Sequence, residues 1–325
     1  MEYFFNKYPR YRFWVLDALT YAGDMRSIPE EIQKSGRFAF WYGDVRNAKI
    51  VDALVSQSDA VMHFAAESHV TRSIYDNLQF FETDVIGTQV IANAVAAHQP
   101  RVERFIHIST CEVYGSAQTV PMNEDHPLYP HSPYAAAKAG ADRLVYSYVK
   151  TYNTPAVIVR PFNVFGPRQH LEKVVPRFIT SGLLREPLTV HGPGKSRRDF
   201  MYVDDLANAL DLLIHAPREK VAGQIFNVGS GKSVGIREIA DKISALMALP
   251  PKQIVHIGNR PGQVENFVAD YGKFRRLFGW KPRVTFENGL IKTISWYKQN
   301  RDWWKDKIWM RHVPILTQDG KIERH

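Results

Sequence analysis

The sequence predicts an α/β protein built on a parallel β-sheet. Short apolar runs of strand length recur in the first half of the chain, at Arg12–Leu16, Phe38–Tyr42, Ala60–Phe64, Arg104–Ile108 and Ala156–Arg160. Stretches with apolar residues at helical spacing lie between them, at Phe80–Ala97 and Tyr134–Thr151. Apolar strands that alternate with helices are typical of a parallel sheet covered on both faces. With 325 residues, 45% of them hydrophobic, the chain can form one large α/β domain and a smaller lobe.

The first two predicted strands are each followed by an aspartate. Residues 1–10 have the pattern of the end of a helix, and the strand that follows them ends at Asp17. The second strand leads into Gly43 and Asp44. In a dinucleotide-binding sheet, an acid at the end of the second strand binds the adenosine ribose hydroxyls and disfavours a 2′-phosphate, and Arg12–Leu16 stands in the place of that second strand. Asp17 therefore favours NAD over NADP.

The stretch from Arg104 to Lys138 holds the residues best suited to chemistry. Its strand is followed at once by Ser109, Thr110, Cys111 and Glu112, and Ser132-Pro133 then begins an Ala-rich helix. Tyr134 and Lys138 are four residues apart, so they share one face of that helix. A Lys ammonium beside a phenol lowers the pKa of the phenol. We therefore expect Tyr134 to act as a base beside hydroxyl groups and a carboxylate at the strand end.

Composition and charge exclude several other classes of function. The net charge is +9 and the pI is about 9.4, but Lys and Arg are scattered, which favours a cleft for a diphosphate over nucleic-acid binding. The single cysteine rules out an intrachain disulfide and is consistent with the cytoplasm. Neither a membrane-spanning run nor a signal peptide is evident, and no His, Cys and Asp cluster has metal-ligand spacing. We therefore expect a cytoplasmic protein without a metal.

Residues 104–138 resemble the extended short-chain dehydrogenase/reductase family. The resemblance rests on four features in order: a strand, the motif Ser-Thr-x-Glu-Val-Tyr-Gly, a loop, and the motif Ser-Pro-Tyr-x-x-x-Lys. Within that family the sequence is most similar to the NAD-dependent nucleotide-sugar 4,6-dehydratases, which include the dTDP-glucose 4,6-dehydratases. The resemblance covers residue 12 to about residue 300. It implies a Rossmann-type doubly wound sheet that binds NAD, formed by residues 1–165 with returning segments near 200–230. It also implies a nucleotide-sugar lobe, 166–200 and 231–310, and a C-terminal tail, 311–325.

The resemblance also implies roles for residues of the central stretch. Tyr134 takes the proton of the substrate C4 hydroxyl, and Lys138 lowers the pKa of Tyr134 and holds the cofactor ribose. Thr110 polarises O4, Glu112 removes the C5 proton, and Cys111 stands where the dehydratases place the acid for the C6 hydroxyl. The implied cofactor-binding residues are Asp17, Leu19, Thr20, Asp44, Val45, Ala65, Ala66, Ser68, Thr83, Ser109, Tyr134 and Lys138. The implied substrate-binding residues are Ser68, His69, Asn163, Lys173, Val174, Thr189, Val190, Arg198, Asn227 and Arg260.

Two departures from the family pattern leave the reaction open. No Gly-x-x-Gly-x-x-Gly turn precedes Asp17, so we expect the first strand and the pyrophosphate loop to be missing, which bears on activity. Cys111 replaces the family's Asp, and a thiol is a poorer acid than a carboxyl. The UDP-glucuronate decarboxylases also lack the Asp and carry Thr-Ser-Glu there, and the apiose/xylose synthases resemble the Thr-Cys-Glu of this chain, so both remain alternatives. A nucleotide-sugar epimerase and a non-catalytic sugar-nucleotide-fold protein remain further alternatives.

The two long predicted helices also indicate an assembly. Phe80–Ala97 and Tyr134–Thr151 carry apolar positions on more than one face. Such helices either pack only on the sheet or form a four-helix contact between two copies. We expect the second arrangement, and therefore a homodimer.

Overall fold

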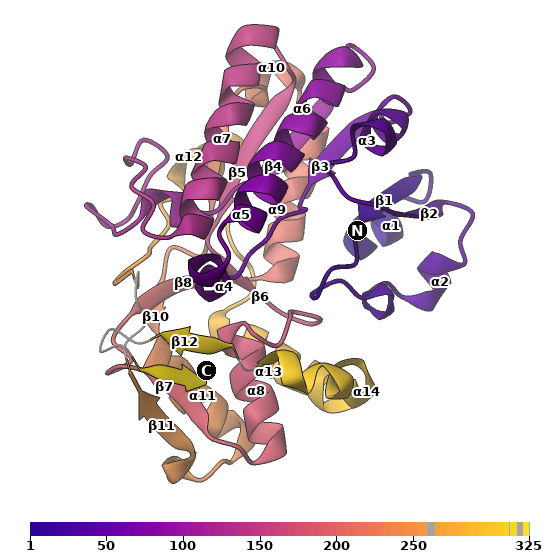
Figure 1. Ribbon diagram of the computed structural model, residues 1–325. Coiled ribbons are helices and arrows are strands. Elements are labelled where there is room, and N and C mark those ends of the chain that lie inside the picture. Colours follow the sequence, from indigo (N-terminus) through magenta and orange to yellow (C-terminus); the bar gives the residue numbers. More distant parts are fainter. Residues whose placement is uncertain (259–263, 312, 317–320, 325) are drawn as a thin grey trace. The chain divides into compact units, whose positions relative to one another are not determined.

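The computed structural model describes residues 1–258, 264–311, 313–316 and 321–324. The chain divides into two compact units (Figure 1). Unit 1 consists of Met1–Val113, Ser132–Pro161 and Ala207–Phe226, and unit 2 consists of Tyr114–His131, Phe162–Leu206 and Asn227–His325. The functional division into a NAD-binding domain and a substrate lobe remains a prediction.

The strands of unit 1 form two sheets. β1 (Phe13–Asp17) pairs with β2 (Phe38–Tyr42) in parallel. The second sheet has the order β3-β4-β5-β9, and β4 pairs in parallel with both β3 and β5. Its strands are β3 (Ala60–His63), β4 (Arg104–Ile108), β5 (Ala156–Pro161) and β9 (Ile225–Val228). The predicted parallel α/β architecture is thus confirmed. β1 is shifted by one residue at both ends, and β3 and β5 each differ from the predicted bounds by one residue at the C-terminal end.

Helices pack on the second sheet through a continuous apolar core. The middle helix is α6 (Gly87–Ala97), which contacts α3 (Ala48–Val55) and α7 (Pro133–Tyr152). Figure 1 shows α6 and α7 side by side in front of the strands. Val95 of α6, Phe105 of β4 and Val145 of α7 are almost completely buried in this core. Burial of these faces provides most of the stability of such helices. The shorter helices of unit 1 are α2 (Glu30–Gln33), α4 (Val70–Tyr75) and α10 (Arg218–Val221).

The helix predicted over Phe80–Ala97 is present but interrupted. α5 (Leu78–Phe80) is followed by a π-helical turn, η2 (Phe81–Ile86), before α6 begins. This turn packs closely on α7, where a Cβ at Gly140 would lie 3.3 Å from the Val85 side chain. Single π turns inside helices are frequent at functional sites. The sequence pattern did not reveal the irregularity.

The N-terminal residues form a short helix, as predicted for this segment. α1 (Glu2–Lys7) is held to α9 (Val203–His215) because Lys7 and the Tyr8 hydroxyl both bind the Asp211 carboxylate. The guanidinium of Arg37 donates to the carbonyl oxygens of Phe5, Tyr8 and Tyr11. Side chains from three parts of unit 1 therefore fix this segment.

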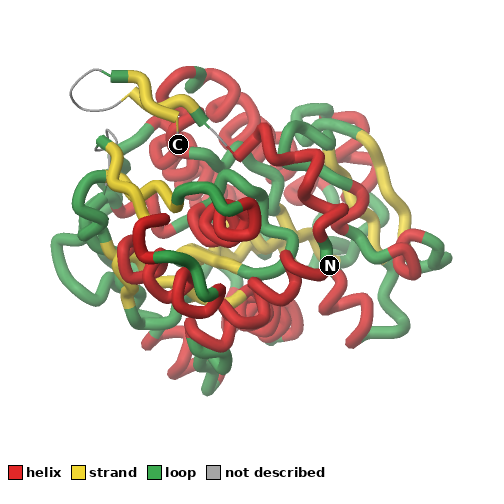
Figure 2. Tube along the Cα trace, turned by 90° about the horizontal axis from the view of Figure 1, so that it is seen from below, coloured by secondary structure: helices red, strands yellow, loops and turns green. Residues whose placement is uncertain are grey.

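The described residues of unit 2 form three small sheets and a largely aromatic and aliphatic core. The order β10-β8-β6 joins Ser233–Gly235, Arg197–Tyr202 and Asn163–Phe165. β7 (Leu188–His191) pairs with β11 (Ile254–Ile257), and β12 (Pro314–Leu316) forms a hairpin with β13 (Ile322–Arg324), which lies beside the C-terminal label in Figure 2. The helices are α8 (Val174–Leu184), α11 (Ile236–Met247), α12 (Gly272–Phe278), α13 (Phe286–Gln299) and α14 (Arg301–Trp304). Phe178, Tyr297 and Trp304 are buried at the centre of their core.

Candidate active site

The start of α7 places Tyr134 and Lys138 in the interior of unit 1. Ser132 caps the helix by accepting a hydrogen bond from the Ala135 amide, and Pro133 fills the first helical position. Tyr134 and Lys138 follow one turn apart, with exposed fractions of 9% and 4%. The prediction that they share one face of a helix is confirmed, and the structure adds that this face is buried.

The end of β4 lies against this helix. The Lys138 Nζ donates to the Ile108 carbonyl oxygen, 2.7 Å away. The Thr110 side chain hydrogen-bonds Tyr134, and the Thr110 Oγ1 accepts from the Glu112 amide at 3.2 Å. Cys111, which begins the short helix η3 (Cys111–Tyr114), is buried. The predicted catalytic residues of strand and helix are therefore brought together in unit 1.

The charge state of the pair differs from the sequence prediction. Burial raises the pKa of Tyr134, and the negative charge of Asp84 raises it further, while the hydrogen bond from Thr110 acts in the opposite direction. Burial also lowers the pKa of Lys138. The expectation of a lowered Tyr134 pKa is wrong for this structure, because burial of the phenol disfavours its ionised form and so raises the pKa.

A buried ion pair that the sequence reasoning missed fixes α7 to the sheet. The Asp142 carboxylate accepts from the Arg160 Nε at 2.9 Å and from the Ser109 hydroxyl at 2.7 Å, and it also binds Arg143. Asp142 and Arg160 are almost completely buried. Burial alone would raise the pKa of Asp142, but the bonds from Arg160 lower it well below its usual value. The position of Asp142, one turn after Lys138, was the available signal.

Further buried titratable groups surround the pair. Asp84 on η2 is 1% exposed, although the sequence singled out only its neighbour Thr83. His63 and His107 lie side by side on β3 and β4, with ring centroids 5.5 Å apart. Burial lowers the pKa of His63 to about 3 and also lowers that of His107, so both rings are neutral near pH 7.

The residues that the resemblance assigns to the cofactor all lie in unit 1. The exposed Asp17 ends β1, and its Oδ1 accepts from the Leu19 amide at 2.7 Å. Asp44 is paired with Arg46 at 2.7 Å, and Val45 is buried in the core. Ser109, in contrast, uses its hydroxyl to bind Asp142. The others in this part of the chain are Thr20, Ala65, Ala66, Ser68 and Thr83, which are exposed or half-buried.

The predicted substrate-binding residues are divided between the units. Ser68 and His69 belong to unit 1, and the His69 ring caps α4 by accepting from the Arg72 amide at 3.3 Å. Arg260 lies outside the described residues. The remainder belong to unit 2: Asn163, Lys173, Val174, Thr189, Val190, Arg198 and Asn227.

The unit 2 residues have differing surroundings. The Asn227 side chain is completely buried, donates to the Met122 carbonyl at 3.0 Å and accepts from the Tyr114 hydroxyl at 2.7 Å. Arg198 is also buried, and its guanidinium lies 5.0 Å from the centre of the Phe267 ring. These contacts hold both side chains in place, while their predicted role toward a diphosphate remains a prediction.

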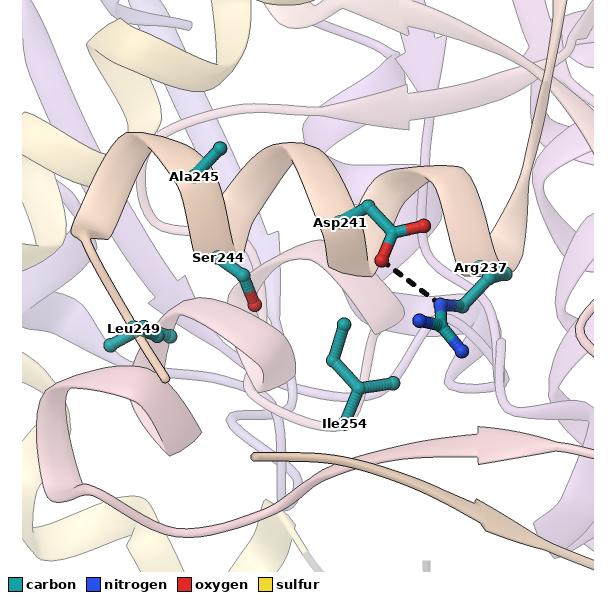
Figure 3. A pocket seen from close by; sticks show the side chains of 6 residues that line it. All are labelled: Arg237, Asp241, Ser244, Ala245, Leu249 and Ile254. Atoms are coloured by element: carbon teal, nitrogen blue, oxygen red, sulfur yellow. Dashed lines mark hydrogen bonds and ion pairs between the residues drawn. The ribbon is translucent and has the colours of Figure 1, made fainter. Parts of the chain in front are cut away.

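A cavity of about 250 Å³ opens in unit 2 beside α11. Figure 3 shows the Arg237–Asp241 ion pair on that helix, with Ser244 and the facing Ile254. None of its lining residues belongs to the predicted site. Within the ranges that the structure describes, no group of His, Cys, Asp or Glu side chains could hold a metal ion, and no helix is long and apolar enough to cross a membrane.

Comparison with known proteins identifies the family. The model of the GDP-mannose 4,6 dehydratase family matches residues 1–293. The chain belongs to this family. A dTDP-glucose 4,6-dehydratase of Actinoplanes is 37% identical over 290 residues, which are 89% of this chain and 89% of that protein. The low-salt glycan biosynthesis protein Agl12 of Haloferax volcanii is 40% identical over 282 residues, 87% of this chain and 89% of Agl12.

Two solved structures of nucleotide-sugar enzymes are similar to this chain. A DesIV double mutant from Streptomyces venezuelae, a dTDP-glucose 4,6-dehydratase with NAD bound, superimposes with a TM-score of 0.89 at 35% identity, covering 94% of each chain. The UDP-glucose 4-epimerase of Thermotoga maritima has a TM-score of 0.84 at 25% identity, covering 92% of this chain and 94% of the other. The predicted extended short-chain dehydrogenase/reductase membership and Rossmann-type fold are thus confirmed.

Proposed function

We propose that this protein is an NAD-dependent nucleotide-sugar 4,6-dehydratase. The observation that carries the proposal is the grouping in unit 1 of Tyr134 and Lys138 with Thr110, Cys111 and Glu112. The named dehydratases at 37% identity support the reaction, and dTDP-glucose is therefore the first substrate to test.

The chain's own residues divide the proton transfers between them. Tyr134, hydrogen-bonded to Thr110, is placed to take the proton of a substrate hydroxyl at O4. Glu112 is the carboxylate that would remove the C5 proton. Cys111 would deliver a proton to the departing C6 hydroxyl. Lys138 supplies a positive charge beside the phenol and thereby favours its ionised form.

The residues at the carboxyl end of β1 are suited to a dinucleotide. Asp17 is exposed, and its Oδ1 already accepts from the Leu19 amide, which orients the carboxylate and leaves Oδ2 to receive ribose hydroxyls. Lys138 would hold the second ribose. When bound, NAD would accept hydride from C4 of the sugar and return it to C6.

Asp17 is expected to make the protein prefer NAD over NADP. Its carboxylate would repel the 2′-phosphate of NADP, whereas the 2′-hydroxyl of NAD can donate to it. Asp17→Ser should narrow the preference mainly by strengthening NADP binding. Titration of both cofactors, followed by calorimetry, measures this. Equal or tighter binding of NADP to the unaltered protein contradicts the prediction.

The role of Cys111 decides how the C6 hydroxyl leaves. If its thiol is the acid, Cys111→Ala should slow elimination while C4 oxidation continues, so NADH accumulates on the protein. Cys111→Asp should keep or raise dehydration, because a carboxyl donates its proton more readily than a thiol. Rapid-mixing absorbance measurements and mass analysis of the products follow both steps. Water loss that is indifferent to Cys111→Ala contradicts the thiol-acid role.

A decarboxylase or ring-contracting synthase is the second candidate, and the observation that favours it is Cys111 itself. Decarboxylation of a nucleotide uronate needs no acid for a C6 hydroxyl, so Cys111→Ala should leave it intact. Offering the protein UDP-glucuronate and dTDP-glucose in parallel distinguishes a decarboxylase or synthase from a dehydratase. Release of carbon dioxide overturns the dehydratase assignment, and failure to bind NAD would favour a non-catalytic protein of the same fold.

We also propose that the protein forms a homodimer through η2, α6 and α7 and works in the cytoplasm. Phe81 and Ile86, both on η2, are 41% and 47% exposed, and exposed apolar side chains that lie together mark interaction surfaces. The cytoplasmic location rests on the single cysteine. A monomeric mass by light scattering at micromolar concentration contradicts the dimer.

A further inference from the structure

Asp84 is a buried carboxylate with an uncommitted oxygen. Its Oδ1 accepts from the Glu67 amide at 2.7 Å. Its Oδ2 is enclosed and has no hydrogen-bond partner among the described residues. Its backbone is held as well, because the Thr88 hydroxyl donates to the Asp84 carbonyl at 2.5 Å. An ionised carboxylate in such a place requires a nearby positive charge.

Lys138 presents the complementary problem. Its ammonium is buried. Among the described residues, the ammonium makes a single hydrogen bond, to the Ile108 carbonyl oxygen. A protonated amine has three donors and a full positive charge, so one carbonyl compensates it only in part. Lys138 therefore needs a carboxylate in the same interior.

The other charged groups near Lys138 are already committed. Asp142 binds Arg160, Arg143 and the Ser109 hydroxyl, so its negative charge is matched by two guanidinium groups. His63 and His107 are neutral because burial lowers their pKa values. This leaves Asp84 as the carboxylate available to Lys138.

The packing places Asp84 and the pair in one interior. Phe80 and Val85, on either side of Asp84 in the sequence, share an apolar cluster with Tyr134 and Ala137 of α7. The Phe80 and Tyr134 rings meet edge to face, with centroids 6.2 Å apart. Asp84 therefore lies on a turn that packs against the start of α7.

We propose that Asp84 is the buried counter-charge of the Tyr134–Lys138 pair, a positioning residue that sets the pH range over which the pair works. The inference deepens the proposed function, because it takes this pair to be catalytic. A negative charge raises the pKa of every neighbouring group. Asp84 therefore keeps Lys138 protonated and, at the same time, delays ionisation of Tyr134.

The facing groups determine the charge on Asp84 itself. Burial raises the pKa of Asp84 to about 7, while Lys138 and the Glu67 amide act to lower it and the Glu67 carboxylate adds to the rise. Tyr134 on α7 is neutral over this range, and so is His63 on β3. Asp84 thus changes charge near neutral pH, with Lys138 as its facing cation.

The first test compares pH–rate profiles of the wild type and Asp84→Asn. The amide can still accept from the Glu67 amide but carries no charge. Above neutral pH, wild-type Asp84 is charged and the asparagine of the variant is not. In that range both limbs of the Asp84→Asn profile should lie about one unit lower in pH, because the pKa values of Tyr134 and Lys138 both fall. The matched control is Glu82→Gln on the same turn, whose side chain is 45% exposed and paired with Arg46, and it should not shift the profile. A uniform loss of rate without a shift overturns the proposal.

The second test needs no substrate, so it separates the counter-charge from the reaction. The folded-state pKa of Asp84 is raised from about 4 to about 7, so its contribution to stability is present in acid and is lost as pH rises through 7. Urea unfolding should therefore show wild type losing stability relative to Asp84→Asn between pH 4.5 and 7. In a Lys138→Met background the Asp84 pKa should rise further, and the loss should continue above pH 7. A difference that is constant with pH, or unaltered by Lys138→Met, overturns the proposal whether or not dehydration is observed.

Discussion

Tyr134→Phe is expected to lower the rate of C4 oxidation by about a hundredfold or more, the range that a positioned acid–base group contributes. The reason is that the phenol hydroxyl, hydrogen-bonded to Thr110, is the group placed to take the substrate proton. Folding should be little changed, because phenylalanine keeps the ring that packs against Phe80 and the rest of the cluster. Steady-state product formation and thermal unfolding of the same samples measure the two effects.

Tyr148→Phe is the matched control. Tyr148 is another buried tyrosine of α7, and its hydroxyl binds Asn93 on α6. Loss of that hydroxyl should leave the rate within about twofold of wild type, because no predicted site residue contacts it. If Tyr134→Phe retains a tenth or more of the wild-type rate, Tyr134 is not the base.

Arg160→Met should be the most destabilising of the substitutions considered, at about 3–5 kcal/mol, because it leaves the Asp142 carboxylate buried without its main partner. Arg160 binds both oxygens of that carboxylate, at 2.9 and 3.0 Å. Without Arg160, burial raises the pKa of Asp142, so in the variant this carboxyl takes up a proton as pH falls from 7 to 4 and part of the lost stability returns, whereas the wild-type carboxylate stays ionised. The destabilisation should therefore shrink in acid.

Arg143→Met serves as the control for this ion pair. Arg143 contacts the same carboxylate, but its side chain is 42% exposed, so its removal should cost about 1 kcal/mol or less. Urea unfolding at pH 7 and at pH 4 measures both variants. Equal effects of the two substitutions, or a cost for Arg160→Met that does not depend on pH, contradict the account.

Two strands have the predicted bounds. β2 is an uninterrupted apolar run of five residues, and β4 is almost completely buried. The helix of Phe80–Ala97 was predicted as regular, but its π turn depends on close packing against Gly140, which the sequence pattern does not contain. Tertiary contact decided that detail.

In the candidate site, too, some residues were predicted from local sequence patterns and others were visible only in the folded chain. Thr110 and Glu112 directly follow a strand, and Tyr134 and Lys138 have a recognisable four-residue spacing, so local patterns predicted them. Asp84 and Asp142 were missed because no such pattern marks them, and their roles follow from burial and from the contacts with the Glu67 amide and Arg160 in the folded chain. The direction of the Tyr134 pKa was wrong for a related reason, since the extent of burial is a property of the folded chain.

The central claim, that this chain performs an internal 4,6-dehydration, is tested most directly with dTDP-glucose that carries deuterium at C4. Incubation with the protein and NAD should give a product that has lost one water, and the deuterium should appear at C6 of the same molecule. Tyr134→Phe should give almost none of this product in the same time. Return of the deuterium to C4 with inverted configuration at that carbon would contradict the account. So would the absence of dehydration of dTDP-glucose together with release of carbon dioxide from UDP-glucuronate offered in a parallel incubation.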